Sequence, residues 1–430
     1  MRVLMFGWEF PPHIAGGLGT ACKGIVEGLA HNGVETLFVM PSASGDEDQS
    51  CTTIVNASDI PLVEVSSSVE EFMDKVKFIK VDSSLQPYFN PEDFDRIAEE
   101  TRKRQTREYR MQFGRKFRFS GKYGANLLEE VARYAGVGAT IAYDNKYAFD
   151  VIHAHDWLTY PAGIAAKEVS GKPLVVHVHA TSFDRGSDDM IDSRGYAIER
   201  RGMEAADCVV TVSDLTRNIV INKYGIDPSK VVTVHNAVDF SGRENLDVER
   251  GVKDKVVTFL GRITYQKGPE YFIEAAGKVL KRTRNVRFVM AGSGDMMTRA
   301  IRQVARLGIS DRFHFTGFLR GQDVQKMFAL SDVYIMPSVS EPFGISPLEA
   351  MRSNVPSIIS HQSGAAEVLK YALKVDFWDV DAMADDIYAL IQYPALASFA
   401  TRQGYDEVNG LKWNEAAAKL KNVYESVVNK

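Results

Sequence analysis

Short apolar strands alternate with helical segments along this chain in two separate series, and this alternation constrains the fold more than any other feature. The first series opens with a strand over residues 2–8, a glycine-rich turn, a helix over 20–31 and a strand over 35–41. It resumes in β-branched runs at 149–157, 173–181, 207–213 and 230–239. Strands that alternate with helices predict a parallel sheet covered by helices, so we expect an α/β chain with a Rossmann-like first domain.

A polar linker separates the two series. It occupies roughly 15 residues after Asp239 and is rich in charged side chains. The alternation then restarts, with strands at 256–262, 286–292, 313–318, 332–338 and 355–360. Because a single core stops growing well below 430 residues, we predict two doubly wound domains that face a cleft, over residues 1–239 and 250–409. An insertion at about 42–133, where the alternation is lost, interrupts the first domain.

The final segment, residues 410–430, predicts an appended amphipathic helix. Its apolar side chains recur at helical spacing, at Trp413, Ala417, Leu420, Val423 and Tyr424. Such a stripe needs a partner surface, so we expect this helix to pack against one of the two domains.

The composition excludes several classes of protein. Hydrophobic residues make up 45% and charged residues 25%, as in ordinary globular chains, which excludes bulk disorder and small disulfide scaffolds. The net charge of −5 argues against a dedicated nucleic-acid or membrane-surface binder, so an anionic substrate would need a local cation site. The three cysteines lack metal or redox spacing, and we find neither a secretory signal nor an apolar run of about 18 residues, so we expect a cytoplasmic protein with reduced thiols.

Two strand-end loops of the second domain supply a candidate anion site. Arg262 ends one strand and Lys267 follows five residues later, and a planar guanidinium beside a compact ammonium can hold a phosphate group in two ways. The loop at 292–295 precedes a helix, whose free N–H groups can meet an anion. An isolated Arg and Lys are more often a solvated surface, and two glycines alone are a weak signal, so the prediction depends on their placement at neighbouring strand ends.

Two carboxylates flank the turn after the strand at 332–338. Glu341 lies at the carboxyl end of that strand, where open α/β sheets bind ligands, so we predict a functional role for it. Glu349 has an equally good structural explanation, because Ser346, Pro347 and Glu349 fit a capping box at the start of a helix.

The first domain contributes a glycine turn and two histidine pairs. Gly16 and Gly17 join the first strand to its helix and would let a diphosphate approach the helix N-terminus, although a tight turn alone also explains them. The pairs His153/His155 and His177/His179 end two strands, and members of a pair share one face of the sheet. Because no Cys or Glu completes a zinc shell, we predict packed or cleft-facing histidines and no metal.

Together these motifs resemble those of the retaining GT-B glycosyltransferases, glycogen and starch synthases in particular. The residues that support the resemblance follow the expected order over nearly the whole chain: Gly16-Gly17-Leu18, His155-Asp156-Trp157, His179, Gly261-Arg262 with Lys267, Gly292-Ser293-Gly294-Asp295, and Glu341-Pro342-Phe343-Gly344 to Glu349. The resemblance implies a GT-B fold, a final helix that crosses back onto the first domain, and hexosyl transfer without a cofactor or metal.

The resemblance also implies roles for individual residues. Arg262 and Lys267 are similar to the cations that hold the donor diphosphate. Glu341 is similar to the acid at the transferred sugar, and Glu349 to the acid at the nucleotide ribose. Asp156 and His179 would lie beside the reacting sugar. The implied donor-binding set is completed by Gly16, Gly17, Gly294, Asp295, Phe343, Gly344 and Ile345. The expected partners are ADP-glucose or UDP-glucose and the non-reducing end of an α-1,4-glucan.

Two departures separate this chain from the bacterial ADP-glucose enzymes. Ile14 and Ala15 precede the glycines where those enzymes have a lysine and a threonine, and Phe343 replaces their cysteine. The opening Trp8-Glu9-Phe10-Pro11-Pro12 looks more like the broader family that includes archaeal-type glycogen synthases and other sugar transferases.

Other functions remain open from the sequence. Transfer of another hexose to a different glycan or small acceptor fits the same motifs, and a nucleotide-sugar epimerase would share the phosphate site. A GT-A transferase would use a D-x-D metal motif, which Asp93-Phe94-Asp95 and Asp379-Val380-Asp381 match only by letters. The basic, aromatic segment at 102–122 could serve an acceptor surface or a non-catalytic glycan- or RNA-binding protein, and a solvated helix face explains it equally well.

Overall fold

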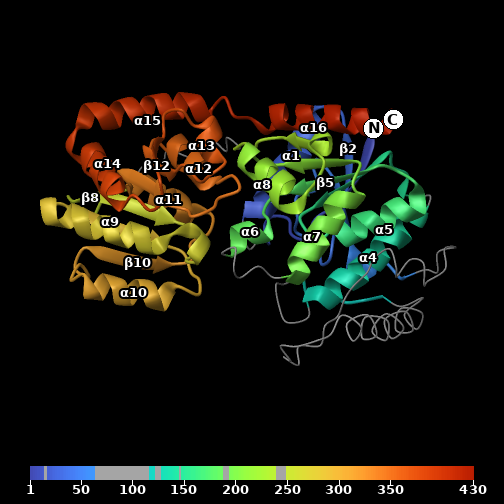
Figure 1. The fold of residues 1–430 in the computed structure, drawn as a ribbon, viewed down its shortest axis with the longest axis horizontal. Coiled ribbons are helices and arrows are strands. Elements are labelled where there is room, and N and C mark those ends of the chain that lie inside the picture. Colours follow the sequence, from blue (N-terminus) through green and yellow to red (C-terminus); the bar gives the residue numbers. More distant parts are fainter. Residues whose placement is uncertain (14–16, 63–115, 122–126, 145–146, 187–192, 239–247) are drawn as a thin grey trace.

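Two parallel sheets divide the chain into two α/β halves (Figure 1). The computed structural model describes residues 1–430 except 14–16, 63–115, 122–126, 145–146, 187–192 and 239–247. Within these ranges the first sheet has the strand order β3-β2-β1-β4-β5-β6-β7 and the second has the order β10-β9-β8-β11-β12-β13. Each order runs outward in both directions from its first strand, and helices cover both faces. The predicted pair of doubly wound Rossmann-like units is confirmed.

The first sheet and its helices span residues 2–233. The strands are β1 (Arg2–Phe6), β2 (Glu35–Met40), β3 (Thr53–Asn56), β4 (Val151–His155), β5 (Leu174–Val178), β6 (Cys208–Thr211) and β7 (Val231–Thr233). The helices are α1 (Gly17–His31), η1 (Ala57–Asp59), α4 (Leu127–Tyr143), α5 (Tyr160–Ser170), α6 (Ser182–Arg185), α7 (Ser193–Ala205), α8 (Asp214–Tyr224) and η4 (Pro228–Lys230). Helix α1 begins before the predicted start at Thr20, because its first residues are glycines, which give no helical signal.

The predicted insertion at 42–133 is partly wrong, because elements of the main fold lie inside it. Strand β3 pairs in parallel with β2 at the edge of the first sheet, and α4 begins at Leu127. Only four residues form β3 and three of them are partly exposed, so its apolar signal is too weak to recognise in the sequence. Most of the basic segment at 102–122 lies outside the described residues.

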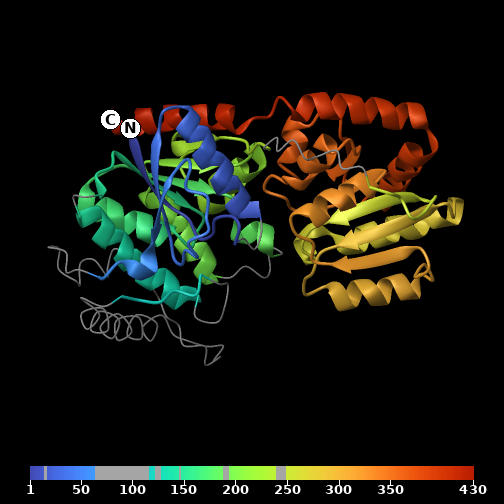
Figure 2. The ribbon, with the colours of Figure 1, turned by 180° about the vertical axis from the view of Figure 1, so that it is seen from behind.

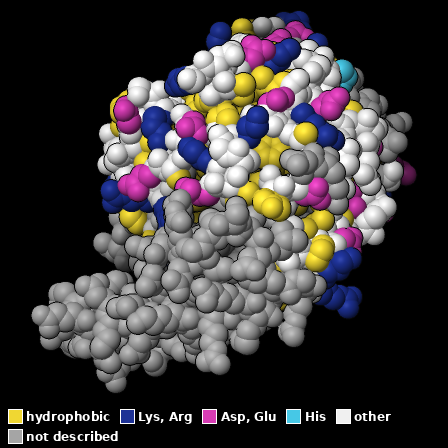
Figure 3. Space-filling view, turned by 90° about the vertical axis from the view of Figure 1, so that its right-hand side faces the viewer, with side chains coloured by type: hydrophobic (Ala, Val, Ile, Leu, Met, Phe, Trp, Pro, Cys, Tyr) yellow, Lys and Arg dark blue, Asp and Glu magenta, His cyan; other side chains and the backbone are white. Residues whose placement is uncertain are grey.

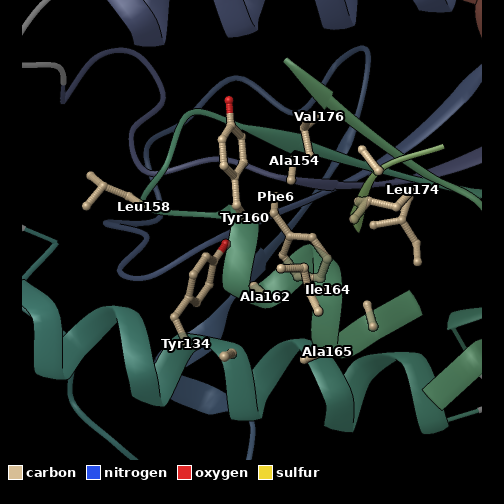
Figure 4. Packing of buried hydrophobic residues seen from close by; sticks show 14 of the residues in the cluster. Phe6, Tyr134, Ala154, Leu158, Tyr160, Ala162, Ile164, Ala165, Leu174 and Val176 are labelled. Atoms are coloured by element: carbon tan, nitrogen blue, oxygen red, sulfur yellow. The ribbon is translucent and has the colours of Figure 1, made fainter. Parts of the chain in front are cut away.

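One face of the first sheet packs on α4 and α5 (Figure 4). Phe6, Ala154 and Val176 project from three adjacent strands toward these helices. The two buried tyrosines keep their hydroxyls satisfied, since Tyr134 donates to the Val39 carbonyl (2.7 Å) and Tyr160 to the His177 carbonyl (3.2 Å). A second apolar cluster fills the opposite face, under α1 and the C-terminal helix.

The C-terminal helix α16 (Trp413–Val428) crosses back and lies along α1 of the first domain (Figures 1 and 2). All five residues of the predicted stripe are buried. Two glycines of α1 allow this close approach: a Cβ on Gly24 would lie 2.2 Å from the Trp413 ring, and one on Gly28 would lie 2.5 Å from the Trp413 carbonyl oxygen. The predicted crossing helix is confirmed.

The second sheet spans residues 255–375. Its strands are β8 (Lys255–Leu260), β9 (Val286–Ala291), β10 (Phe313–Gly317), β11 (Val333–Met336), β12 (Ser357–Ser360) and β13 (Leu373–Val375). The helices are η5 (Tyr265–Lys267), α9 (Pro269–Arg282), α10 (Met297–Arg306), α11 (Gln322–Leu330), α12 (Ser346–Arg352), α13 (Ala365–Val368), α14 (Val380–Gln392) and α15 (Pro394–Val408). The sequence analysis did not anticipate β13 or α13–α15.

Three observations concern the expectations drawn from composition about membranes, surface charge and cysteines. Within the described ranges, no helix combines the length and the apolar character needed to cross a membrane. Figure 3, which faces the first-domain end, shows Lys and Arg side chains interspersed with Asp and Glu, so on the part drawn in colour neither charge gathers into one field. The thiols of Cys22, Cys51 and Cys208 are free, and those of Cys22 and Cys208 are buried.

Candidate active site

The carboxyl ends of strands from both sheets meet at the boundary between the two halves. Ser340, in the loop after β11, donates a hydrogen bond of 2.6 Å to Asp184 in α6, which follows β5. The one-turn helix η5, which follows β8, packs against the same α6. The loops that follow β5, β8 and β11 therefore form a common site, as expected for open α/β sheets.

An ion pair between Lys267 and Glu341 lies at the centre of this site. Lys267 Nζ donates to Glu341 Oε2, and the Ser338 hydroxyl donates to the same oxygen at 3.2 Å. The carboxylate is nearly buried, with 8% of its side chain exposed, whereas 22% of the lysine side chain is exposed. The main chain of Glu341 is fixed by hydrogen bonds with Gln362 and Gly364. Lys267, predicted at the donor diphosphate, and Glu341, predicted at the transferred sugar, are thus in direct contact.

The loops that contain Arg262 and the Gly-Ser-Gly-Asp turn form one unit. Ile263 N donates to the Ser293 carbonyl at 2.9 Å, and a Cβ on Gly294 would lie 2.2 Å from the Ile263 carbonyl oxygen. Only glycine allows this approach of the two backbones. The side chains of Arg262 and Asp295 are exposed at the surface of this unit.

The segment at 343–349 approaches the Glu341 side chain at Gly344. Phe343 is buried, and Gly344 has a positive φ of 96° with no room for a side chain, since a Cβ would lie 3.1 Å from Glu341 Cγ. Ile345 directly precedes α12.

The predicted capping box at Ser346 is wrong. The N-cap residue of α12 is Ile345, without a side-chain cap, and the Ser346 hydroxyl instead accepts a hydrogen bond of 2.9 Å from Tyr334. Burial raises the pKa of Glu349, and the nearby charge of Arg352 partly offsets this. The structural explanation for Glu349 is therefore lost, and its role at the ribose stays a prediction.

Asp156 joins the ends of β4 and β5 and thereby fixes His179. Its φ is 61°, a left-handed conformation that is uncommon outside glycine. Its Oδ1 accepts hydrogen bonds from the backbone amides of His179 (2.8 Å) and Ala180 (3.2 Å). Burial raises the pKa of Asp156 to about 7, although the Arg185 charge and both amides lower it. The Asp156 carboxylate thus holds the main chain that follows β5. Its direct contact with the sugar stays a prediction.

The four histidines of β4 and β5 lie together on the face of the sheet that α1 and α16 cover. His153, His155 and His177 are buried, and His179 is partly exposed at the strand end. One nitrogen from each of the first three lies within 4.8 Å of the others, a grouping that could hold a metal ion. The His153 and His177 rings are nearly parallel, at 13°, which does not point their nitrogens at one common centre. The prediction of no metal remains a prediction.

The glycine turn of the first domain is only partly described. Gly16 lies outside the described residues, whereas Gly17 is the exposed first residue of α1. The buried carboxylate of Glu9 accepts a hydrogen bond of 3.1 Å from Gly19 N in the first turn of α1. Glu9 belongs to the Trp-Glu-Phe-Pro-Pro opening, which the sequence analysis used only as a family marker.

Several polar residues of the site were missed in the sequence. Arg185 pairs with the buried Glu199, which also accepts a hydrogen bond from the Tyr224 hydroxyl. Asp184 forms a capping box with Thr181 at the start of α6, and this Thr-x-x-Asp spacing was a usable signal. The ion-pair partner of Arg185 comes from α7 and is itself bonded to Tyr224 of α8, and such tertiary contacts leave no local signal.

A carboxylate of the second domain also caps a helix of the first. Glu367 of α13 accepts hydrogen bonds from the backbone amides of Asp214 (2.9 Å) and Leu215 (2.7 Å) at the start of α8, and contacts His235 Nε2 at 2.7 Å. The side chains of the Glu367 and His235 pair are 24% and 26% exposed.

The Asp-Val-Asp sequence at 379–381 serves as a helix cap, since Asp379 accepts a hydrogen bond from Ala382 N at the start of α14. Asp93 and Asp95 lie outside the described residues.

Comparison with known families agrees with this two-part architecture. Residues 243–406 match the model of the family described as glycosyl transferases group 1. Residues 90–241 match that of glycosyltransferase family 4, so the two models together span most of the chain. Successive parts of the chain thus match two glycosyltransferase family models.

Similar proteins share the whole length of this glycosyltransferase. An uncharacterized glycosyltransferase of Methanocaldococcus jannaschii is 29% identical, over 99% of this chain and 98% of its own length. A glycogen synthase of Mycobacterium tuberculosis is 22% identical over 99% of this chain and 94% of its own. Among solved structures, the Anabaena protein HepE in complex with UDP and glucose superposes with a TM-score of 0.66 at 16% identity, covering 99% of this chain and 100% of its own. This superposition confirms the GT-B arrangement of the fold.

Proposed function

We propose that this glycosyltransferase transfers glucose, with retention of configuration and without a metal, from ADP-glucose or UDP-glucose to the non-reducing end of an α-1,4-glucan. The observation that supports it most directly is the Lys267–Glu341 ion pair at the carboxyl ends of β8 and β11, beside the exposed Arg262. Transfer from a nucleotide sugar requires positive charge at the departing diphosphate and a polar group at the sugar, and this site offers both.

Two cations would stabilise the leaving group. Arg262 is exposed and can form a bidentate contact with a phosphate, whereas Lys267 is a point charge held in place by Glu341. A pair of oriented side-chain cations can do this work in place of a metal ion. We also assign to Gly17, the exposed first residue of α1, the approach of the same diphosphate to the first domain.

Retention can occur through two routes, and the site favours one of them. A double displacement needs a carboxylate nucleophile with a second acid about 5 Å away. In the described residues, the Glu341 carboxylate pairs with Lys267 and Ser338, and the Asp156 carboxylate holds two backbone amides, so both already have a role in ordering the site. We therefore assign a front-face route, in which the bond from C1 to the phosphate oxygen breaks, the acceptor oxygen bonds to C1 on the same side, and the leaving phosphate accepts the proton of the acceptor hydroxyl.

The assignment of a glucan as acceptor is based on sequence similarity. A glycogen synthase aligns with this chain over nearly the full length of both proteins. The UDP and glucose bound to HepE, a protein of the same fold, support a nucleotide-activated glucose as donor. Phe343 and the missing lysine before Gly16 separate the chain from the bacterial enzymes that use ADP-glucose. We therefore propose either ADP-glucose or UDP-glucose as the donor.

A matrix of donors and acceptors tests this proposal. ADP-glucose, UDP-glucose and UDP-N-acetylglucosamine would each be combined with glycogen, a maltooligosaccharide or a monosaccharide, and the released nucleoside diphosphate measured. We expect release with one glucose donor and an α-1,4-glucan, an α-linked product by NMR, and no loss of rate in a metal chelator. Conversion of a donor without any acceptor would instead show an epimerase, and release only with small acceptors would contradict the glucan assignment.

A further inference from the structure

The histidines of β4 and β5 form a continuous column that leads from the C-terminal helix to the candidate site. Ring centroids are 4.2 Å apart for His153 and His155, and 5.2 Å apart for His155 and His179. Tyr424 of α16 hydrogen-bonds to His153 Nδ1 at 2.7 Å at the buried end. At the other end, His179 is partly exposed at the carboxyl edge of the sheet. The predicted sugar-side histidine is thus the last member of a buried column.

The ring of His179 stacks on His177 and hydrogen-bonds to His155. His155 Nδ1 and His179 Nε2 are 2.9 Å apart and share one hydrogen bond. Burial lowers the pKa of His179 to about 3 and holds that of His155 well below its usual value, so both rings are neutral near pH 7. A neutral imidazole has one N–H donor and one lone-pair acceptor, so the direction of this bond decides where His179 carries its proton.

The surroundings of His155 favour one direction of this bond. In the described part of the chain, no group hydrogen-bonds to His155 Nε2, which is buried. If His179 donated the bond, His155 would carry its own proton on Nε2 as a buried N–H without an acceptor, a rarer defect in proteins than an unused acceptor. If His155 donates from Nδ1, only a lone pair is left unused at Nε2.

We infer that His155 is a positioning residue: it donates from Nδ1 to His179 Nε2 and so fixes His179 as the Nδ1–H tautomer, with that N–H as the donor its ring offers to the cleft. The next residue in the chain has a parallel task, since Asp156 holds the backbone amide of His179. Two consecutive residues at the end of β4 therefore fix the ring and the main chain of the residue that follows β5. This inference rests on the proposed function only in placing a sugar beside His179.

The tautomer can be measured without any substrate. Long-range proton–nitrogen NMR spectra of the full-length protein, labelled with 15N in histidine only, distinguish Nδ1–H from Nε2–H rings, and a His179→Asn variant identifies the His179 signals. We expect the Nδ1–H pattern in the wild type. An Nε2–H pattern for His179 would overturn the inference, as would one equivalent of tightly bound metal with His155 among its ligands.

Three variants separate positioning from packing. His155→Leu removes the donor at similar volume, whereas His155→Asn retains an amide N–H near the former Nδ1. His153→Leu is the matched control, because it removes a buried imidazole of the same strand that bonds to Tyr424 and not to His179. We expect the Nδ1–H pattern of His179 to become a mixture in His155→Leu and to persist in the other two variants.

The kinetics provide a second readout on the same variants. With the donor and acceptor that the matrix identifies, we expect kcat to fall by roughly tenfold or more in His155→Leu, with KM for the donor little changed, and to recover in His155→Asn. Equal losses in His155→Leu and His153→Leu would show that the column only packs. Failure of every donor would contradict the proposed function while leaving the NMR result intact, so the two failures are distinguishable.

Discussion

The Lys267–Glu341 pair shows how one residue can serve both the fold and the chemistry. A nearly buried carboxylate costs free energy unless it is paired, and Lys267 with Ser338 satisfies Glu341. The same arrangement holds the ammonium partly accessible, since 22% of the lysine side chain is exposed. A residue that stabilises the ligand-free site is thereby oriented in advance for an anionic ligand.

Replacement of Lys267 tests this residue at the level of catalysis. We expect Lys267→Ala to lower kcat by about 10²–10³, because an oriented charge at the leaving group is lost. The matched control is Lys278→Ala, which removes a lysine from the exposed pair with Asp381. Steady-state rates on both variants measure the effect. Equal, small losses in the two variants would contradict the assignment of Lys267.

The buried histidines predict a measurable dependence of stability on pH. Burial lowers the pKa of His153 to about 3, so between about pH 6.5 and 3 the unfolded chain binds a proton that the folded chain does not. This contribution to stability is fully present above pH 6.5 and is lost as the pH falls toward 3.

A His153→Phe variant isolates that contribution. We expect its free energy of unfolding to fall less steeply between pH 6 and 4 than that of the wild type, by about 1.4 kcal/mol per pH unit. Urea denaturation at a series of pH values measures both slopes. Parallel slopes would mean that His153 is protonated in the folded protein, against its burial.

At the scale of elements, the packing of α16 on α1 fixes the position of the C-terminal helix on the first domain. Small residues face each other across this contact, and Gly28 approaches the Trp413 backbone. Helices that come this close lose all space for an additional side chain. The register of α16, and with it the position of Tyr424 below the histidine column, therefore depends on the glycines of α1.

Enlarging Gly28 tests that contact. We expect Gly28→Val to lower the free energy of unfolding by roughly 1–3 kcal/mol, because its Cβ alone would lie 2.5 Å from the Trp413 carbonyl oxygen. Gly251→Val is the control, since a Cβ at that exposed glycine meets nothing within 4 Å. Chemical denaturation of the two variants gives the comparison. An unchanged stability in Gly28→Val would show that α16 is free to shift.

At the scale of the whole molecule, polar contacts join the two halves. Glu367 reaches from the second domain to two amides and a histidine of the first, and Ser340 reaches Asp184. The Glu367–His235 contact is partly exposed and contributes little to stability by itself, but together these contacts favour the observed arrangement of the two halves. We expect substitutions at Glu367 or Ser340 to change how readily the two halves separate more than they change the free energy of unfolding.

Removal of the Glu367 carboxylate tests this. We expect Glu367→Ala to favour the open form by about fivefold, the equivalent of roughly 1 kcal/mol, and to increase the radius of gyration in small-angle X-ray scattering. Glu407→Ala is a matched control, because Glu407 also caps two backbone amides, at Lys370 and Tyr371, within the second domain only. Identical scattering of the two variants would contradict a role of Glu367 in closure.

Local patterns were sufficient to predict the class of fold and most strands. Alternating strands and helices, a polar linker and an amphipathic last helix are short-range signals, so two doubly wound units and an appended packing helix followed from them. The crossing of that helix to the first domain came from the family resemblance. Short or partly exposed elements such as β3 and β13 were missed, because their periodicity extends over too few residues. The capping box at Ser346 failed for a related reason: the spacing was correct, but a tertiary partner, Tyr334, occupies the hydroxyl.

The sequence by itself determined which residue types stand at the strand ends, including Arg262, Lys267, Glu341, Asp156 and His179. Only the tertiary structure decided which of them touch. Lys267 and Glu341 are 74 residues apart in sequence, and His155 and His179 are 24 apart, yet each pair shares a hydrogen bond. Parallel strands bring such distant residues to one edge, and burial there sets their charge and tautomer. Neither the pairing nor the burial can be read from spacing along the chain, because both depend on how sheets and helices pack.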